Sequence, residues 1–243
     1  MEKARMSEGL FQVRVQVPPS EDYPGEGGWL WVLPDSGEME RAFASARWVE
    51  ILFWRGSNSV IETVNSLYQK ASAILGCPYP PEAIGIILTE LIQNALKANY
   101  KRCHFREHGI NADDPEQYEQ GLITFKEKIS VRTEDLFARA VRDNLHVRVR
   151  LLPEPGRQIE IHVINNSPLF PVEARRIREK LEASAMYDNI MDFLMEHQDE
   201  TEGAGLGMLV ITLSLREMGL PADSFTVREE DARGTVASLC LTW

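Results

Sequence analysis

The sequence predicts an α+β fold in which helices pack against a sheet of paired strands. Segments with the two-residue hydrophobic period of strands form pairs around turns, and helical segments precede, separate and follow those pairs. This arrangement favours an α+β sandwich over a parallel α/β fold. With 243 residues, 44% of them hydrophobic, the chain is long enough to bury one sizeable core.

The N-terminal segment is expected to contain strands. Hydrophobic and polar residues alternate from Phe11 to Val17, which is typical of a half-buried strand. A stretch rich in Pro, Gly and acidic residues, Pro18 to Gly28, separates it from the apolar run Trp29 to Leu33. We interpret residues 1–56 as a β-containing extension and residues 57–243 as the main domain.

Helices open the main domain. Ser59 is the predicted N-cap of the first helix and Gly76 its stop, and Pro80 and Pro81 begin the second. The second helix is expected to face the core through apolar residues at helical spacing: Ile84, Ile87, Leu88, Leu91 and Ala95. Two further helices are predicted: Asp114–Ile129 and Thr133–Asn144.

Strands and helices then alternate to the end of the chain. Four strands are predicted: His146–Leu152, Ile159–Asn165, Phe225–Glu229 and Thr235–Leu241. One helical stretch is expected from Pro171 to about His197, and another from a glycine cluster to Met218, with Gly219 as its C-terminal glycine.

Charge and cysteine usage exclude several classes of protein. Twenty-six Lys and Arg against 37 Asp and Glu give a net charge of −11, which argues against a nucleic-acid-binding surface. The three cysteines form no C-x-x-C pair, and we expect Cys103 to lie at a helix end beside surface histidines, His104 and His108, rather than in a metal site. No signal peptide or membrane-spanning run is evident, so a cytoplasmic protein without membrane insertion is expected.

Three polar residues on the second helix form the first candidate site. Glu90, Asn94 and Lys97 stand at i, i+4 and i+7, which places them in one stripe beside the apolar face. A carboxylate, an amide oxygen and an ammonium in this arrangement suit a magnesium–nucleotide complex. A solvated helix face is an equally open interpretation of the stripe.

Two loops are further candidates. Gly203, Gly205 and Gly207 precede a helix, where exposed backbone amides can hold a phosphate, although a simple hinge would have the same composition. Asn165 and Asn166 end a strand and could face a polar ring edge, or they could form an ordinary Asn-rich turn.

Together and in this order, the three motifs resemble the ATP-binding domain shared by sensor histidine kinases, DNA gyrase, MutL and the anti-sigma-factor serine kinases. Thr89–Asn99 is similar to the family's N box, which typically reads E-L-x-x-N-A-x-K, and Glu202–Met208 is similar to its second glycine box, G-x-G-L-G. Arg233–Thr235 resembles the closing Gly-Thr element. The resemblance covers roughly residues 57–243.

This resemblance implies a two-layer α/β sandwich with a mixed, mostly antiparallel sheet, and ATP and Mg²⁺ as ligands. Glu90 would be the general base and Asn94 the Mg²⁺ ligand. The family's pattern also implies phosphate-binding and adenine-side residues: Lys97, Gly203, Gly205, Leu206 and Gly207 for the phosphates, and Asn165 and Thr235 for the adenine.

The first glycine box departs from the family's D-N-G-x-G-I-P pattern. Asn165 replaces the aspartate that accepts a hydrogen bond from adenine, and Ser167 and Leu169 replace two glycines. No pair of helices with a phosphoacceptor histidine precedes the motifs, so we expect a bacterial signalling ATPase or serine/threonine-type kinase that acts on a protein partner. A pseudo-ATPase that serves as a binding or scaffold module is the alternative, and a homodimer is left open.

Overall fold

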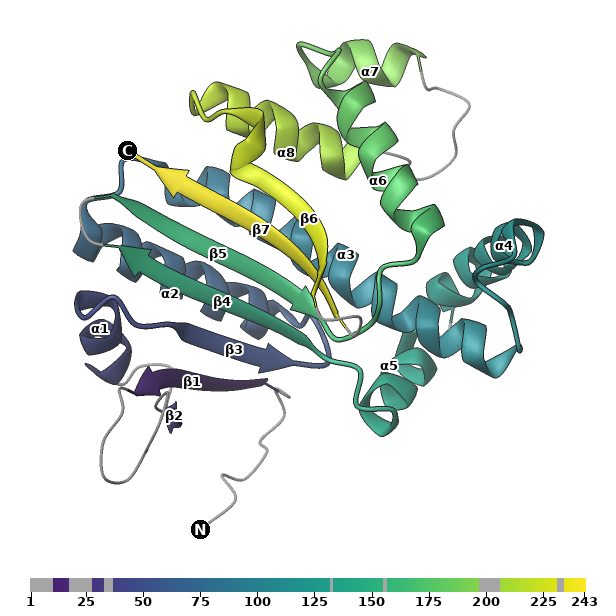
Figure 1. Ribbon diagram of the computed structural model, residues 1–243, viewed down its shortest axis with the longest axis horizontal. Helices are drawn as coiled ribbons and strands as arrows, with labels where there is room; N and C mark the ends of the chain where they lie inside the picture. Colours follow the sequence, from purple (N-terminus) through teal and green to yellow (C-terminus); the bar gives the residue numbers. More distant parts are fainter. Residues whose placement is uncertain are drawn as a thin grey trace.

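The computed structural model describes residues 11–17, 28–32, 37–131, 133–154, 157–196, 206–230 and 234–243. Seven strands form one sheet in the order β2-β1-β3-β4-β5-β7-β6 (Figure 1). They are β1 (Phe11–Val17), β2 (Gly28–Val32), β3 (Val49–Phe53), β4 (Val147–Glu154), β5 (Gln158–Asn165), β6 (Phe225–Glu230) and β7 (Gly234–Thr242). The α+β prediction is confirmed. The expected mixed sheet is wrong, because every pairing between the described strands is antiparallel.

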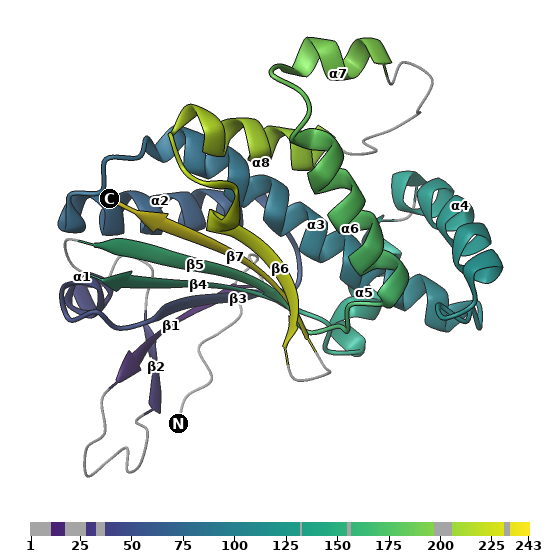
Figure 2. The ribbon, with the colours of Figure 1, turned by 45° about the horizontal axis from the view of Figure 1, so that its top comes forward.

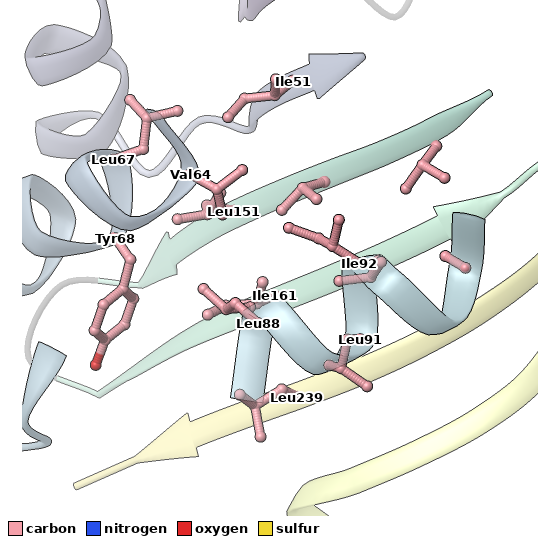
Figure 3. Packing of buried hydrophobic residues seen from close by; sticks show 14 of the residues in the cluster. Ile51, Val64, Leu67, Tyr68, Leu88, Leu91, Ile92, Leu151, Ile161 and Leu239 are labelled. Carbon is pink, nitrogen blue, oxygen red and sulfur yellow. The ribbon is translucent and has the colours of Figure 1, made fainter. Parts of the chain in front are cut away.

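Helices lie along one face of this sheet, so the molecule has two layers (Figures 1 and 2). The helices are α1 (Gly37–Ala44), α2 (Asn58–Leu75), α3 (Pro81–Glu107), α4 (Pro115–Val131), α5 (Thr133–Arg142), α6 (Pro171–Ser184), α7 (Ile190–Glu196) and α8 (Leu206–Glu217), and α2, α3 and α8 cover the sheet. Leu88 and Ile92 of α3 pack toward Ile161 of β5, while Val64 of α2 lies over Leu151 of β4 (Figure 3). All five side chains are fully buried.

Helix α2 begins two residues earlier than predicted. Ser57, not Ser59, is its N-cap, and the Ser57 hydroxyl accepts a hydrogen bond from the backbone N–H of Val60. A side-chain oxygen in this position satisfies one of the backbone donors that the first turn leaves unpaired. The predicted stop is confirmed, because Gly76 adopts the left-handed conformation with φ of 67°.

Helix α3 positions the candidate site. The apolar face predicted for it is buried from Ile84 to Ala95, and Pro81 is its first residue. Its 27 residues correspond to a length of about 40 Å. The helix therefore extends beyond the edge of the sheet, where its C-terminal part meets α4 and α5 (Figure 1).

The stretch predicted as one helix from Pro171 to about His197 is two helices. Helix α6 ends at Ser184, and α7 begins at Ile190. Arg216 of α8 donates hydrogen bonds to the backbone carbonyls of Ala185 and Tyr187, at 3.0 Å each. These carbonyls lie just beyond the end of α6, so a tertiary contact stabilises the break.

The N-terminal strands belong to the same sheet as the rest of the chain. Strand β3 pairs with β1 on one side and with β4 on the other, with Ile51 opposite Val149. Buried residues of β1, α1 and β3 share one hydrophobic cluster with those of α2 and α3. The described part of residues 1–56 contributes three strands and one helix and completes the core of the main fold.

Candidate functional site

Six of the predicted site residues, from four separate elements, line one cavity of about 850 Å³. They are Glu90, Asn94 and Lys97 of α3, Asn165 of β5, Gly207 of α8 and Thr235 of β7. The predicted Gly203 and Gly205 lie outside the described residues. Leu206 is half-buried at the start of α8, and the cavity lining does not include it.

Glu90 and Asn94 of α3 meet the start of α8 directly. Asn94 donates a hydrogen bond through Nδ2 to Oε1 of Glu90, at 2.9 Å. A methyl group added at Gly207 would lie 1.9 Å from the same Oε1, far inside van der Waals contact. The backbone of α8 therefore approaches Glu90 as closely as it does because residue 207 has no side chain.

Asn94 and Lys97 have polar atoms available to a ligand. Because the Asn94 amide nitrogen donates to Glu90, its Oδ1 is the remaining polar atom, and no donor to it is found among the described residues. Lys97 is exposed at the cavity edge. The pair offers a neutral oxygen acceptor and a mobile positive charge one turn apart on α3.

The end of β5 is tied to β7 at the opposite side of the cavity. Asn165 is buried and donates through Nδ2 to Oγ of Ser167, at 2.6 Å. Thr235 donates through its hydroxyl to the backbone carbonyl of Ser167, at 2.9 Å. These bonds leave Oδ1 of Asn165 as an acceptor, and the bond from Asn165 requires the hydroxyl of Ser167. Leu169 also lines the cavity.

A buried ion-pair network in the same cavity was missed from the sequence. Arg102 donates to both carboxylate oxygens of Glu173 on α6 and to the carbonyl of Pro168, and its guanidinium lies 4.0 Å from the centre of the Phe170 ring. Lys101 pairs with the same carboxylate. The spacing of Lys101 and Arg102 from Lys97, four and five positions along α3, was the available signal, but it could not reveal Glu173 as their partner.

The network perturbs the titration of its members. Burial by itself would raise the pKa of Glu173, but the hydrogen bond from Arg102 and the charges of Lys101 and Arg102 outweigh it and hold that pKa at about 2. Burial lowers the pKa of Lys101, and the charge of Glu173 opposes this shift. The carboxylate therefore stays ionised at neutral pH and anchors α6 to α3.

Cationic side chains continue along the lining between α4 and α6. Besides Lys101 and Arg102, it includes Lys126, Arg176 and Lys180, together with Glu119 and Glu179. Arg176 pairs with Glu119, which connects the two helices across the opening. The cavity wall on this side combines positive charge with the apolar side chains of α4, which suits an anionic ligand with an apolar part.

The prediction that His104 is a surface histidine is wrong. Its side chain is 1% exposed, because α4 packs against the C-terminal half of α3 and covers it. Burial, with smaller contributions from the charges of His108 and Lys128, lowers the pKa of His104. Cys103 is also buried, and burial raises the pKa of its thiol to about 11, so it is not a reactive thiolate.

The chain is similar in sequence to a bacterial protein. A protein of Treponema pallidum (strain Nichols), described as an uncharacterized protein, is 31% identical over 160 residues. The match covers 66% of this chain and 31% of the relative, so the chain spans about a third of that protein's length. No family model matches the chain, and no solved structure matches it. Within the described residues, no helix is both long and apolar enough to cross a membrane.

Proposed function

We propose that the protein binds Mg-ATP in this cavity and is a signalling kinase or ATPase of the histidine-kinase-like class that acts on a protein partner. The observation that carries the proposal is the meeting of α3, β5, α8 and β7 residues at one cavity. These residues come from four sequence segments that are far apart along the chain. A solvated helix face and an unrelated hinge would not be expected to share a lining.

The donor set fits a magnesium–nucleotide complex. Asn94 presents an amide oxygen, a ligand type that Mg²⁺ prefers, and Lys97 presents a positive charge for a phosphate. A bound Mg²⁺ would neutralise the negative charge on phosphate oxygens. Glu90, fixed by its hydrogen bond from Asn94, would accept the proton of the attacking water or hydroxyl.

Asn165 is the candidate adenine-reading residue. Its Nδ2 is held by Ser167, so its Oδ1 would accept a hydrogen bond from the adenine amino group. An amide oxygen makes a weaker hydrogen bond than the carboxylate found in the family. Thr235 would act through the carbonyl of Ser167, which it holds, and so support the position of this acceptor.

A pseudo-ATPase that binds a partner without turnover is the second candidate function. Leu169 favours it, because this side chain occupies part of the lining where the family has a glycine. The two candidates differ in measurable ways. The kinase or ATPase binds and turns over ATP, whereas the scaffold protein shows no turnover.

Thermal denaturation with Mg-ATP, Mg-ADP and Mg-GTP tests the proposal. A ligand at 100 times its Kd stabilises the native state by about 2.7 kcal/mol, which is readily measured. We expect stabilisation by the adenine nucleotides, followed by ATP turnover measured as phosphate release. Absence of stabilisation at millimolar nucleotide would refute ATP binding, while stabilisation without turnover would favour the pseudo-ATPase.

Replacement of the Mg²⁺ ligand gives a sharper test. Asn94→Ala is expected to weaken nucleotide binding in the presence of Mg²⁺ and to leave binding in EDTA nearly unchanged. Gln93→Ala is the matched control, because Gln93 is exposed on the same helix and does not line the cavity. Equal losses with and without Mg²⁺ in Asn94→Ala would contradict the assigned role.

A further inference from the structure

The C-terminal end of α3 carries a second group of potential ligands, and none of its members lines the cavity. His104, Glu107 and His108 stand at i, i+3 and i+4, and their ligand atoms all lie within 4.8 Å of one another. The two imidazole rings are 4.5 Å apart between centroids. Two histidines four positions apart on one helix recur as a pair of zinc ligands.

His104 is held in an orientation and tautomer that suit a metal ligand. Its Nε2 lies 2.9 Å from the hydroxyl of Thr124 on α4, and that hydroxyl donates its own proton to the carbonyls of Gln120 and Gly121. With its single proton directed to these carbonyls, the Thr124 oxygen accepts a hydrogen bond from Nε2–H, and this arrangement favours that tautomer. The other nitrogen, Nδ1, is left as an acceptor, and it is buried with no partner among the described residues.

An unsatisfied buried acceptor carries a free-energy cost that a ligand would remove. Metal-binding histidines commonly donate their second ring N–H to a neighbouring oxygen, as His104 does to Thr124. The environment of His104 therefore has both parts of such a site: a fixed outer hydrogen bond and a free nitrogen.

Glu107 divides its two carboxylate oxygens between different partners. Oε1 pairs with Arg139 of α5, at 2.7 Å, while Oε2 pairs with Lys128 of α4. Oε2 is also the atom nearest the second histidine, 3.7 Å from Nε2 of His108. Arg139 can thus keep the carboxylate in place while Oε2 exchanges the ammonium of Lys128 for a cation.

We propose that His104 Nδ1, His108 Nε2 and Glu107 Oε2 bind Zn²⁺, with water as a further ligand. Imidazole nitrogens with one carboxylate suit zinc rather than Mg²⁺ or Ca²⁺, which prefer sets of oxygen ligands. Because Lys128 pairs with the same Oε2, zinc and Lys128 compete for it. Zinc binding therefore releases one of the ion pairs between α3 and α4.

Titration calorimetry of the full chain with zinc chloride tests this site. We expect one Zn²⁺ per chain. His108→Ala is the main variant, because the His108 side chain is 49% exposed and its loss spares the core. Loss of an outer-shell partner alone typically weakens metal binding roughly 10–100-fold, so loss of this ligand should weaken it at least about tenfold.

Two further variants separate ligation from a structural effect. Lys128→Gln removes the competing ammonium and should tighten zinc binding about two- to fivefold, the range that corresponds to loss of a surface ion pair. A variant that merely loosened the helix end would weaken binding instead. His162→Gln is the matched control, since His162 lies on β5 beside Glu160 and should leave the affinity unchanged.

Each outcome decides the question. One zinc per chain, weakened in His108→Ala, tightened in Lys128→Gln and unchanged in His162→Gln, supports the site. The proposal is overturned if the wild-type protein shows no zinc binding, if His108→Ala keeps the wild-type affinity, or if Lys128→Gln binds zinc no more tightly.

Discussion

The contact between Gly207 and Glu90 leads to a prediction about protein stability. Gly207→Ala should destabilise the wild-type protein but stabilise a variant that lacks the Glu90 side chain. In the wild-type protein, the methyl group of Gly207→Ala would lie 1.9 Å from Oε1 and 2.4 Å from Cδ of Glu90. Ordinary contacts between such atoms are about 3.5 Å, so the carboxylate must retreat by about 1.5 Å. We therefore expect Glu90 to leave its rotamer and to lose the hydrogen bond from Asn94.

Three free-energy contributions determine the size of the effect of Gly207→Ala. An off-rotamer side chain costs about 0.5–1.5 kcal/mol, and a lost hydrogen bond costs a similar amount. Replacing glycine by alanine in a helix stabilises by up to about 1 kcal/mol. Gly207→Ala should therefore lower the free energy of unfolding by about 1 kcal/mol in the wild-type background. In a Glu90→Ala background, Gly207→Ala should raise the free energy of unfolding, because the clash with the carboxylate is gone.

Urea denaturation of the four forms measures this coupling as a double-mutant cycle, and it requires no nucleotide. We expect a coupling free energy of about 1–3 kcal/mol. Independent sites are additive within about 0.5 kcal/mol, so a coupling below that value would refute the close approach of α8 to Glu90 and, with it, the geometry of the candidate site.

Two further predictions concern Glu173 and Asn165, which also line the cavity. The folded-state pKa of Glu173, about 2, lies below its ordinary value of 4.5, so its stabilising effect is present above pH 4.5 and is lost as the pH falls toward 2. Urea denaturation should show that the free energy of unfolding of the wild-type protein falls by about 3 kcal/mol more than that of Glu173→Gln over this pH interval. Identical pH profiles of the free energy of unfolding for the two proteins would contradict the ion pair. Asn165→Asp should tighten ATP binding by up to about tenfold, because hydrogen bonds to charged groups are stronger, and should not tighten GTP binding. Calorimetry that finds equal changes for both nucleotides would show that Asn165 does not read the base.

Local sequence patterns were sufficient to predict most of the helices and strands. The buried face of α3 follows from hydrophobic residues at helical spacing, and the end of α2 follows from Gly76, which can adopt a positive φ without strain. The β4–β5 hairpin follows from two strand patterns that come one after the other along the chain. These features depend on residues that are neighbours along the chain, so a single sequence contains the signal.

The candidate site was predictable in its components but not in its connections. The stripe of Glu90, Asn94 and Lys97 is a consequence of helical periodicity alone. That Gly207 touches Glu90, and that Glu173 pairs with Arg102, depends on how α8 and α6 pack on α3. The spacing of residues along the chain does not reveal contacts between side chains on different helices.

The sequence by itself determined the order and type of most of the elements, because backbone conformation responds to local periodicity, caps and turns. Only the tertiary structure decided which strands share a sheet and which polar side chains are buried away from solvent. Strands β1 and β3 extend the sheet because β3 pairs with β4, a contact between residues about 100 positions apart. His104 is buried rather than exposed because α4 covers it. The pKa of such an ionisable group depends on its burial by other elements more than on its neighbours in sequence.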